Sequence, residues 1–341
     1  MDIQALQKTI NHWLSGDKGI LAMDESTASC NKRFEALGIP QTTEMRRRYR
    51  ELIVTAAGLG EYISGAILFD ETIHQQANDG ILFTEHLKNN GIIPGIKVDL
   101  GTMALAGFPE EKITEGLDGL SGRLSSYYDK GARFAKWRAV FAIEGNLPSG
   151  GYLYANCHLL ARYAAVCQEV GLVPIVEPEV LVSGTHSLDI CENITKRTLD
   201  FLFGEMLKQR VKLDAILLKP NMITAGIDHQ NQPGILAVAE ATVLCLLETI
   251  PAYVPGIAFL SGGQSAQLAS ARLNEMHIRF KNSMPWKLTY SFSRALQQPA
   301  LGCWRGADEN IQQAQKKLVK RAALNSAANR GVYHVSMEND D

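Results

Sequence analysis

The sequence lacks the features of a secreted or membrane-bound protein. It begins Met1-Asp2-Ile3 without the basic stretch and apolar core of a signal peptide, and none of its apolar runs is long enough to cross a bilayer. Cysteine is scarce and has no paired spacing, which argues against a disulfide framework and for reduced thiols. The six cysteines are Cys30, Cys157, Cys167, Cys191, Cys245 and Cys303. We therefore expect a cytoplasmic protein with no membrane partner.

Metal-binding and catalytic-triad motifs are also missing. The eight histidines show no Glu-x-x-His or paired spacing, and none stands at the end of a predicted strand. A serine or cysteine nucleophile would need a histidine base, so the same absence argues against that chemistry. We expect solvated or core histidines, no metal and no bound cofactor.

Neither sign of charge is in excess, since 34 lysines and arginines face 36 acidic residues. This balance argues against a general nucleic-acid-binding surface but leaves room for a local basic pocket. A small anionic ligand fits the composition better than a polyanion does.

What the chain does contain is one pattern repeated eight times. A short apolar run meets a charged or hydroxyl residue, and a helical segment follows. The runs end near positions 24, 69, 97, 138, 177, 219, 261 and 291, with the clearest helical segments at about 43–57, 117–131, 152–170, 195–212, 235–248 and 264–280. The alternation predicts an α/β fold, a single (β/α)8 TIM barrel. A doubly wound sheet is the alternative, but it should show Gly-x-Gly-x-x-Gly after its first strand, where that motif is absent.

The barrel is expected to occupy residues 1–333 as one domain. Apolar residues at helical spacing predict an additional N-terminal helix over 2–15, and a closing helix of mixed charge over about 307–330. Residues 334–341 form a short acidic tail without a structural signal.

Lys219 ends the sixth apolar run, Ala215 to Leu218, and is followed by Pro220. A residue before proline is pushed toward extended geometry, so Lys219 should lie at the carboxyl end of a strand, where barrels keep their active sites. A solvated surface lysine is the alternative for this stretch taken alone.

The other strand ends collect many ionisable groups, which either form ion pairs around the rim or serve a reaction. A lysine amine has a pKa near 10.4 in water and needs a neighbouring cation or burial to become a nucleophile near neutral pH. Lys136 is a candidate for that cation and Glu177 for the group that moves protons as an imine forms. The charged strand-end set is Asp24, Lys97, Lys136, Arg138, Glu177, Glu179, Lys219 and Arg294.

Two stretches are candidates for phosphate binding. Ser261-Gly262-Gly263-Gln264 follows a strand and opens a helix, so its amides and the helix dipole favour an anion, and Arg294 adds a fork of donors. Gly-Gly after a strand is also a common turn. A second cluster, Ser26, Ser29, Lys32 and Arg33, follows the first strand end. Two anion sites flanking an amine indicate a bisphosphorylated carbonyl substrate.

Six ordered motifs that together span essentially the whole chain to about Tyr333 resemble the class I fructose-bisphosphate aldolases. The motifs are Asp24-Glu25-Ser26-Thr27, Gly95-Ile96-Lys97-Val98-Asp99, Phe134-Ala135-Lys136-Trp137-Arg138, Pro174-Ile175-Val176-Glu177-Pro178-Glu179, Leu217-Leu218-Lys219-Pro220-Asn221-Met222 and Phe259-Leu260-Ser261-Gly262-Gly263-Gln264. The resemblance implies metal-independent, reversible cleavage of fructose 1,6-bisphosphate to dihydroxyacetone phosphate and glyceraldehyde 3-phosphate, in glycolysis and gluconeogenesis. It also implies a TIM barrel that is usually a homotetramer.

The resemblance further implies a role for each strand-end residue. Lys219 matches the Schiff-base lysine, Glu177 the acid/base of imine formation and Lys136 its cationic neighbour. Asp24 matches the residue that orients the substrate and assists carbon–carbon cleavage, and Glu179 matches a second acid beside Glu177. The matches to substrate and phosphate positions are Ser261, Gly262, Arg294 and Ser291 for the 1-phosphate end, Ser26, Ser29, Arg33 and Lys97 for the 6-phosphate end, and Arg138 for the pocket wall.

Some positions depart from the family pattern. Asp214-Ala215 stands where Glu-Gly is common, Ala28 replaces a glycine in the first loop, and Ser293 replaces a glycine before the phosphate arginine. Vertebrate-type members end in a tyrosine implicated in carbanion protonation, whereas this sequence ends in Asp341, which leaves the proton donor open. A transaldolase-like Schiff-base barrel acting on monophosphates and a catalytically silent binding protein remain the alternatives, and substrate preference is not determined by sequence.

Overall fold

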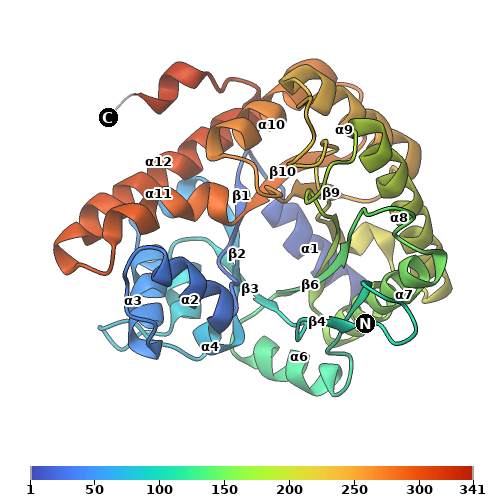
Figure 1. Ribbon diagram of the computed structural model, residues 1–341. Helices are drawn as coiled ribbons and strands as arrows, with labels where there is room; N and C mark the ends of the chain where they lie inside the picture. Colours follow the sequence, from blue (N-terminus) through green and yellow to red (C-terminus); the bar gives the residue numbers. More distant parts are fainter. Residues whose placement is uncertain (1, 340–341) are drawn as a thin grey trace.

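Eight parallel strands close into one barrel in the computed structural model of the chain, which describes residues 2–339 (Figure 1). The predicted (β/α)8 barrel is thereby confirmed. Around the barrel the strands follow the order β1-β10-β9-β8-β7-β6-β3-β2. Their bounds are β1 Gly19–Ala22, β2 Ile63–Leu68, β3 Ile93–Lys97, β6 Phe134–Phe141, β7 Val173–Val180, β8 Leu217–Leu218, β9 Gly256–Phe259 and β10 Lys287–Phe292.

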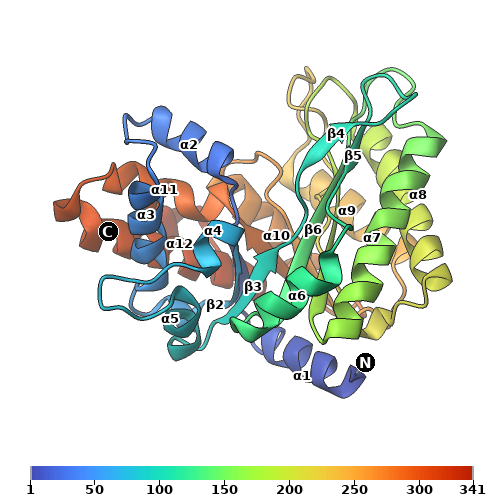
Figure 2. The ribbon, with the colours of Figure 1, turned by 90° about the horizontal axis from the view of Figure 1, so that it is seen from below.

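Helices surround the barrel and cover its outer face (Figures 1 and 2). The α-helices are α1 Ile3–Trp13, α2 Thr27–Glu35, α3 Thr43–Val54, α4 Asp70–Ile73, α5 Phe83–Asn89, α6 Leu120–Asp129, α7 Gly150–Val170, α8 Leu188–Lys208, α9 Ile235–Thr249, α10 Ala266–Phe280, α11 Arg294–Trp304 and α12 Ile311–Arg330. The 3-10 turns are η1 Leu59–Glu61, η2 Leu213–Ala215, η3 Asp308–Asn310 and η4 Val335–Glu338. No helix among residues 2–339 combines the length and the apolar character that crossing a bilayer requires.

Strand residues alternate between the barrel interior and the layer beneath the helices. In β6, Phe134 belongs to the inner apolar cluster, whereas Ala135 and Trp137 belong to the cluster packed under the helices. Residues i and i+2 of a strand share a face. Phe134 therefore places Lys136 and Arg138 on the inward side, above an apolar layer.

The same alternation carries through three other strands. Ile175 of β7 lies in the inner cluster two residues before Glu177, Leu217 of β8 two residues before Lys219, and Ala22 of β1 two residues before Asp24. The interior thus changes from apolar to charged at one level around the ring, toward the carboxyl ends of the strands.

The opposite end of the barrel is covered by α1, which lies across it in Figure 2. The Trp13 ring meets the Phe134 ring edge-on at 4.1 Å between centroids. Gly65 of β2 makes this contact possible, because a Cβ at that position would lie 2.3 Å from Nε1 of Trp13. Water is therefore excluded from the amino-terminal end by apolar packing.

Several predicted boundaries shift because side-chain caps decide where helices begin. The helix expected at 195–212 is α8, which starts at Leu188 because Ser187 caps it, and α10 starts two residues late because Ser265 caps it. The run 215–218 is a strand only at Leu217–Leu218, since the carbonyl of Ala215 is bonded by the Gln168 side chain rather than by a neighbouring strand.

Other elements lie outside the predicted pattern. The hairpin of β4 (Thr102–Ala104) and β5 (Lys112–Thr114) rises at the carboxyl end of the barrel, and α11 fills the interval before the closing helix. That closing helix, α12, begins at Ile311 rather than 307. Part of the predicted tail is ordered in η4, where Glu338 pairs with Arg321 at 2.5 Å, while 340–341 lie outside the described residues.

Candidate active site

One cavity of about 870 Å³ opens at the carboxyl end of the barrel. Its wall contains every residue that the sequence assigned to the site, from the ends of seven strands and from the loops and helices that follow them. These are Asp24, Ser26, Ser29, Arg33, Lys97, Lys136, Arg138, Glu177, Glu179, Lys219, Ser261, Gly262, Ser291 and Arg294. The structure thus brings the set together, while the role of each residue stays a prediction.

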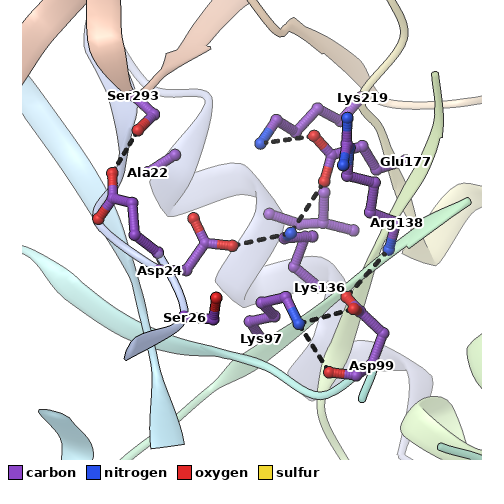
Figure 3. A network of polar contacts seen from close by, with 12 residues as sticks. Ala22, Asp24, Ser26, Lys97, Asp99, Lys136, Arg138, Glu177, Lys219 and Ser293 are labelled. Carbon is purple, nitrogen blue, oxygen red and sulfur yellow. Dashed lines mark hydrogen bonds and ion pairs between the residues drawn. The ribbon is translucent and has the colours of Figure 1, made fainter. Parts of the chain in front are cut away.

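Two lysines share one carboxylate at the centre of the cavity (Figure 3). Nζ of Lys219 lies 3.0 Å from Oε1 of Glu177, and Nζ of Lys136 lies 3.1 Å from Oε2 of the same side chain. Lys136 also lies 2.7 Å from Oδ2 of Asp24. All four groups are buried. The cluster holds two cations and two anions, so it is close to neutral overall.

The charges in this cluster support one another against burial. Burial alone would raise the pKa of Asp24, but Lys136 and Lys219 outweigh it and hold the pKa of Asp24 well below its ordinary value. The same balance lowers the pKa of Glu177. Burial would lower the pKa of Lys136, but Asp24 and Glu177 raise it above the usual lysine value. Lys136 is therefore a fixed cation, and the two carboxylates are ionised at neutral pH.

Two further ion pairs stand nearer the cavity rim. Nζ of Lys97 lies 2.6 Å from Oδ1 of Asp99, and Nε of Arg138 lies 2.5 Å from Oε2 of Glu179. The other Asp99 oxygen accepts the backbone N–H of Arg138 at 3.3 Å. Asp99 therefore ties the ends of β3 and β6 together and fixes the position of the Lys97 amine.

The predicted phosphate loop has the backbone shape that an anion needs. Gly262 and Gly263 have φ of 53° and 82°, a left-handed geometry that glycine adopts at low cost. The loop opens α10, and Arg294 starts α11 beside it, since a Cβ at Gly263 would lie 3.8 Å from an Arg294 guanidinium nitrogen. Exposed amides, two helix starts and a guanidinium converge on one edge of the cavity.

The first loop is held by a network that sequence reasoning missed. Oε1 of Glu25 accepts hydrogen bonds from Arg33 at 2.7 Å and from the Ser293 hydroxyl, and Oε2 lies 2.8 Å from Arg50. Arg33 also donates to Ser293 at 3.1 Å. Burial would raise the pKa of Glu25, but Arg50 and Arg33 lower it to about 2. Ser293, noted in the sequence only as a departure, thus connects the first loop to the start of α11 (Figure 3).

Other wall residues also lay outside the predicted set. His74 borders the cavity, 3.5 Å from Asp70, although the sequence placed no histidine at the site. Asp99 stands two residues after Lys97, a spacing that signals a shared face and would have identified it. Within residues 2–339 no group of three or more His, Cys, Asp and Glu side chains is arranged to hold a metal ion.

Comparison with known proteins agrees with this geometry. Residues 5–341 match the sequence model of the family described as fructose-bisphosphate aldolase class-I. A probable fructose-bisphosphate aldolase class 1 of Xanthomonas campestris is 50% identical over 97% of this chain and 99% of its own, and the cytosolic fructose-bisphosphate aldolase 4 of Arabidopsis thaliana is 48% identical over 93% and 80%.

The fold is shared with a solved relative. The Plasmodium falciparum fructose-bisphosphate aldolase, crystallised with TRAP and a small-molecule inhibitor, superimposes with a TM-score of 0.95 and 43% identity, over 97% of this chain and 96% of that one. Family match, relatives and fold coincide over nearly the whole length. The chain therefore belongs to the class I fructose-bisphosphate aldolase family.

Proposed function

We propose that this chain cleaves fructose 1,6-bisphosphate reversibly to dihydroxyacetone phosphate and glyceraldehyde 3-phosphate through an imine on Lys219. The observation that carries the proposal is the buried pairing of Lys219 with Glu177, which also contacts Lys136. The class works without a metal because the imine itself withdraws electrons.

The chemistry follows from the positions of these groups. Lys219 gives a proton to Glu177 and attacks C2 of the substrate, and loss of water from the carbinolamine leaves a protonated imine. The C3–C4 bond then breaks and its electron pair moves toward the imine nitrogen, giving an enamine. The C4 hydroxyl gives its proton to a carboxylate, and Asp24 is our candidate. Protonation at C3 and hydrolysis release dihydroxyacetone phosphate.

The two ends of the cavity support a substrate with two phosphates. Ser261, Gly262, Ser291 and Arg294 stand on one side of Lys219, and the 6-phosphate set is Ser26, Ser29, Arg33 and Lys97. We assign Arg138 and Glu179 to the wall between them and to proton movement, respectively. Fixed cations hold a bisphosphate more tightly than a monophosphate.

Trapping with borohydride tests the imine. Dihydroxyacetone phosphate plus borohydride should inactivate the protein and add mass to the peptide that contains Lys219, whereas Lys219→Arg should gain no mass and should not turn over. Modification at another lysine of the active wild-type enzyme would contradict the assignment. Activity is expected to survive EDTA.

Substrate comparison separates this activity from a transaldolase-like one. Turnover of fructose 1,6-bisphosphate should exceed that of fructose 1-phosphate and fructose 6-phosphate at equal concentration. Equal turnover of a monophosphate would favour the second reaction, and folded protein without cleavage would favour a binding role.

We also propose a homotetramer in the cytoplasm. Membership of the family supports the assembly, and the cytosolic relatives from Arabidopsis support the compartment, although a chloroplastic relative from Chlamydomonas reinhardtii also matches. Light scattering of the purified protein should give four times the chain mass of 37.4 kDa.

A further inference from the structure

Arg272 of α10 is a buried cation without a counter-ion. It is 4% exposed, and no carboxylate of residues 2–339 lies within ion-pair distance of it. The three other buried arginines each have an acidic partner, Arg46 with Glu71, Arg50 with Glu25 and Arg321 with Glu338.

The Arg272 guanidinium contacts only neutral groups. One terminal nitrogen donates to the side-chain oxygen of Gln264 at 2.8 Å, the other donates to the carbonyl of Pro233 at 3.4 Å, and Nε has no partner. Burial lowers its pKa to about 10, so the group stays charged near neutral pH. An unpaired charge in a protein interior is costly, and a neutral side chain of similar volume would be easier to bury.

The position of this charge suggests what it is for. Gln264 ends the loop Ser261–Gln264, and Pro233 belongs to the segment that joins Lys219 to α9. Side chains in a helix lean toward its amino terminus, which brings Arg272 back toward the loop that starts α10. Neither Arg272 nor Gln264 lines the cavity, so the contact is made behind the loop.

We propose that Arg272 is a positioning residue that places an unneutralised positive charge behind the loop Ser261–Gln264 and thereby strengthens its binding of the substrate phosphate. This inference rests on the proposed function. A carboxylate partner for Arg272 would cancel the field, which explains why Gln264 and a backbone carbonyl, both neutral acceptors, stand there instead.

Three variants test the charge. Arg272→Met removes it at similar volume, Arg272→Lys keeps it without the planar fork, and Arg279→Met removes an exposed charge from the same helix, where Arg279 pairs with Glu275. For fructose 1,6-bisphosphate, Arg272→Met should raise KM about five- to tenfold with kcat within about twofold, because the charge acts on binding. Arg272→Lys and Arg279→Met should stay within about twofold of wild type.

Stability gives a second readout that a purely structural arginine would move in the other direction. Arg272→Met should unfold at the wild-type temperature or higher, because it removes a buried unpaired cation. Inorganic phosphate should raise the melting temperature of wild type and of Arg272→Lys but have a clearly smaller effect on Arg272→Met, and this measurement needs no turnover.

Three results would overturn the inference. They are a lower melting temperature of Arg272→Met with unchanged KM, a KM for Arg272→Lys as high as that of Arg272→Met, and an equal phosphate effect in all variants. Failure of the proposed function is a different result, because the wild type itself would then cleave no fructose 1,6-bisphosphate.

Discussion

Replacing Lys136 with methionine should destabilise the protein by about 3–5 kcal/mol at neutral pH, the cost of breaking a buried ion pair from one side. The magnitude follows from the contacts that are lost. Lys136 lies 2.7 Å from Asp24 and 3.1 Å from Glu177, and all three groups are buried. Glu177 keeps Lys219 at 3.0 Å, whereas Asp24 keeps no cation at ion-pair distance among the described residues. Most of the loss therefore falls on Asp24.

The pH dependence of this loss has a definite sign. In the wild type the pKa of Asp24 is held below its ordinary value, so its contribution is present at neutral pH and is lost only as pH falls below the unfolded value of about 4. In Lys136→Met, burial of Asp24 without its close cation raises the pKa above that value. Protonation then relieves the variant as pH falls, and the stability gap to the wild type narrows.

Urea unfolding at pH 7.5 and pH 5 measures both effects. The double variant Lys136→Met/Asp24→Asn should recover about 1–2 kcal/mol at pH 7.5, because it removes the stranded carboxylate. Lys88→Met is the matched control, since Lys88 forms an exposed pair with Glu85 and should cost less than about 1 kcal/mol. A loss below about 1 kcal/mol for Lys136→Met, or an equal gap at both pH values, would refute the reasoning.

Three other changes give separate checks. Glu25 has its pKa lowered from 4.5 to about 2, so its carboxylate should contribute about 3 kcal/mol above pH 4.5 and lose this as pH falls toward 2; thermal unfolding of Glu25→Gln should show lower stability at pH 7 and a flatter pH dependence. Ser293→Gly removes an acceptor of Arg33, and KM for fructose 1,6-bisphosphate should rise about threefold while KM for fructose 1-phosphate stays constant in steady-state kinetics. Gly65→Ala places a methyl group 2.3 Å from Trp13 and should lower stability by about 2 kcal/mol, seen as a lower urea midpoint, without changing KM.

Strand ends were the part of the site that sequence predicts well. An apolar run that stops at a charged residue puts that residue at the barrel mouth, and the spacing of two between Lys136 and Arg138 puts both on one face. These rules depend only on local periodicity and on closure of the barrel. They succeed for Asp24, Glu177 and Lys219 because each follows an inward-facing apolar residue by two positions.

What sequence could not predict depends on groups that meet only in the folded chain. The partners of Glu25 come from α2, α3 and the turn after β10, so no local pattern joins them. Arg272 sits in a helix of mixed polarity, where an arginine is expected to be solvated, and it is buried by Gln264 and Pro233 from two loops. The β4–β5 hairpin is short and β4 is exposed, so it lacks the apolar alternation that marks a strand.

The helix that covers the amino-terminal end of the barrel also imposes an order on biosynthesis. Trp13 contacts Phe134 of β6, and Leu14 packs so closely on Gly256 of β9 that a Cβ there would lie 2.6 Å from it. On the ribosome, α1 is made before all of these partners. Its apolar face must stay unpacked until β9 has been synthesised, so the first helix made is among the last to find its place, and a chaperone that covers it would protect the nascent chain.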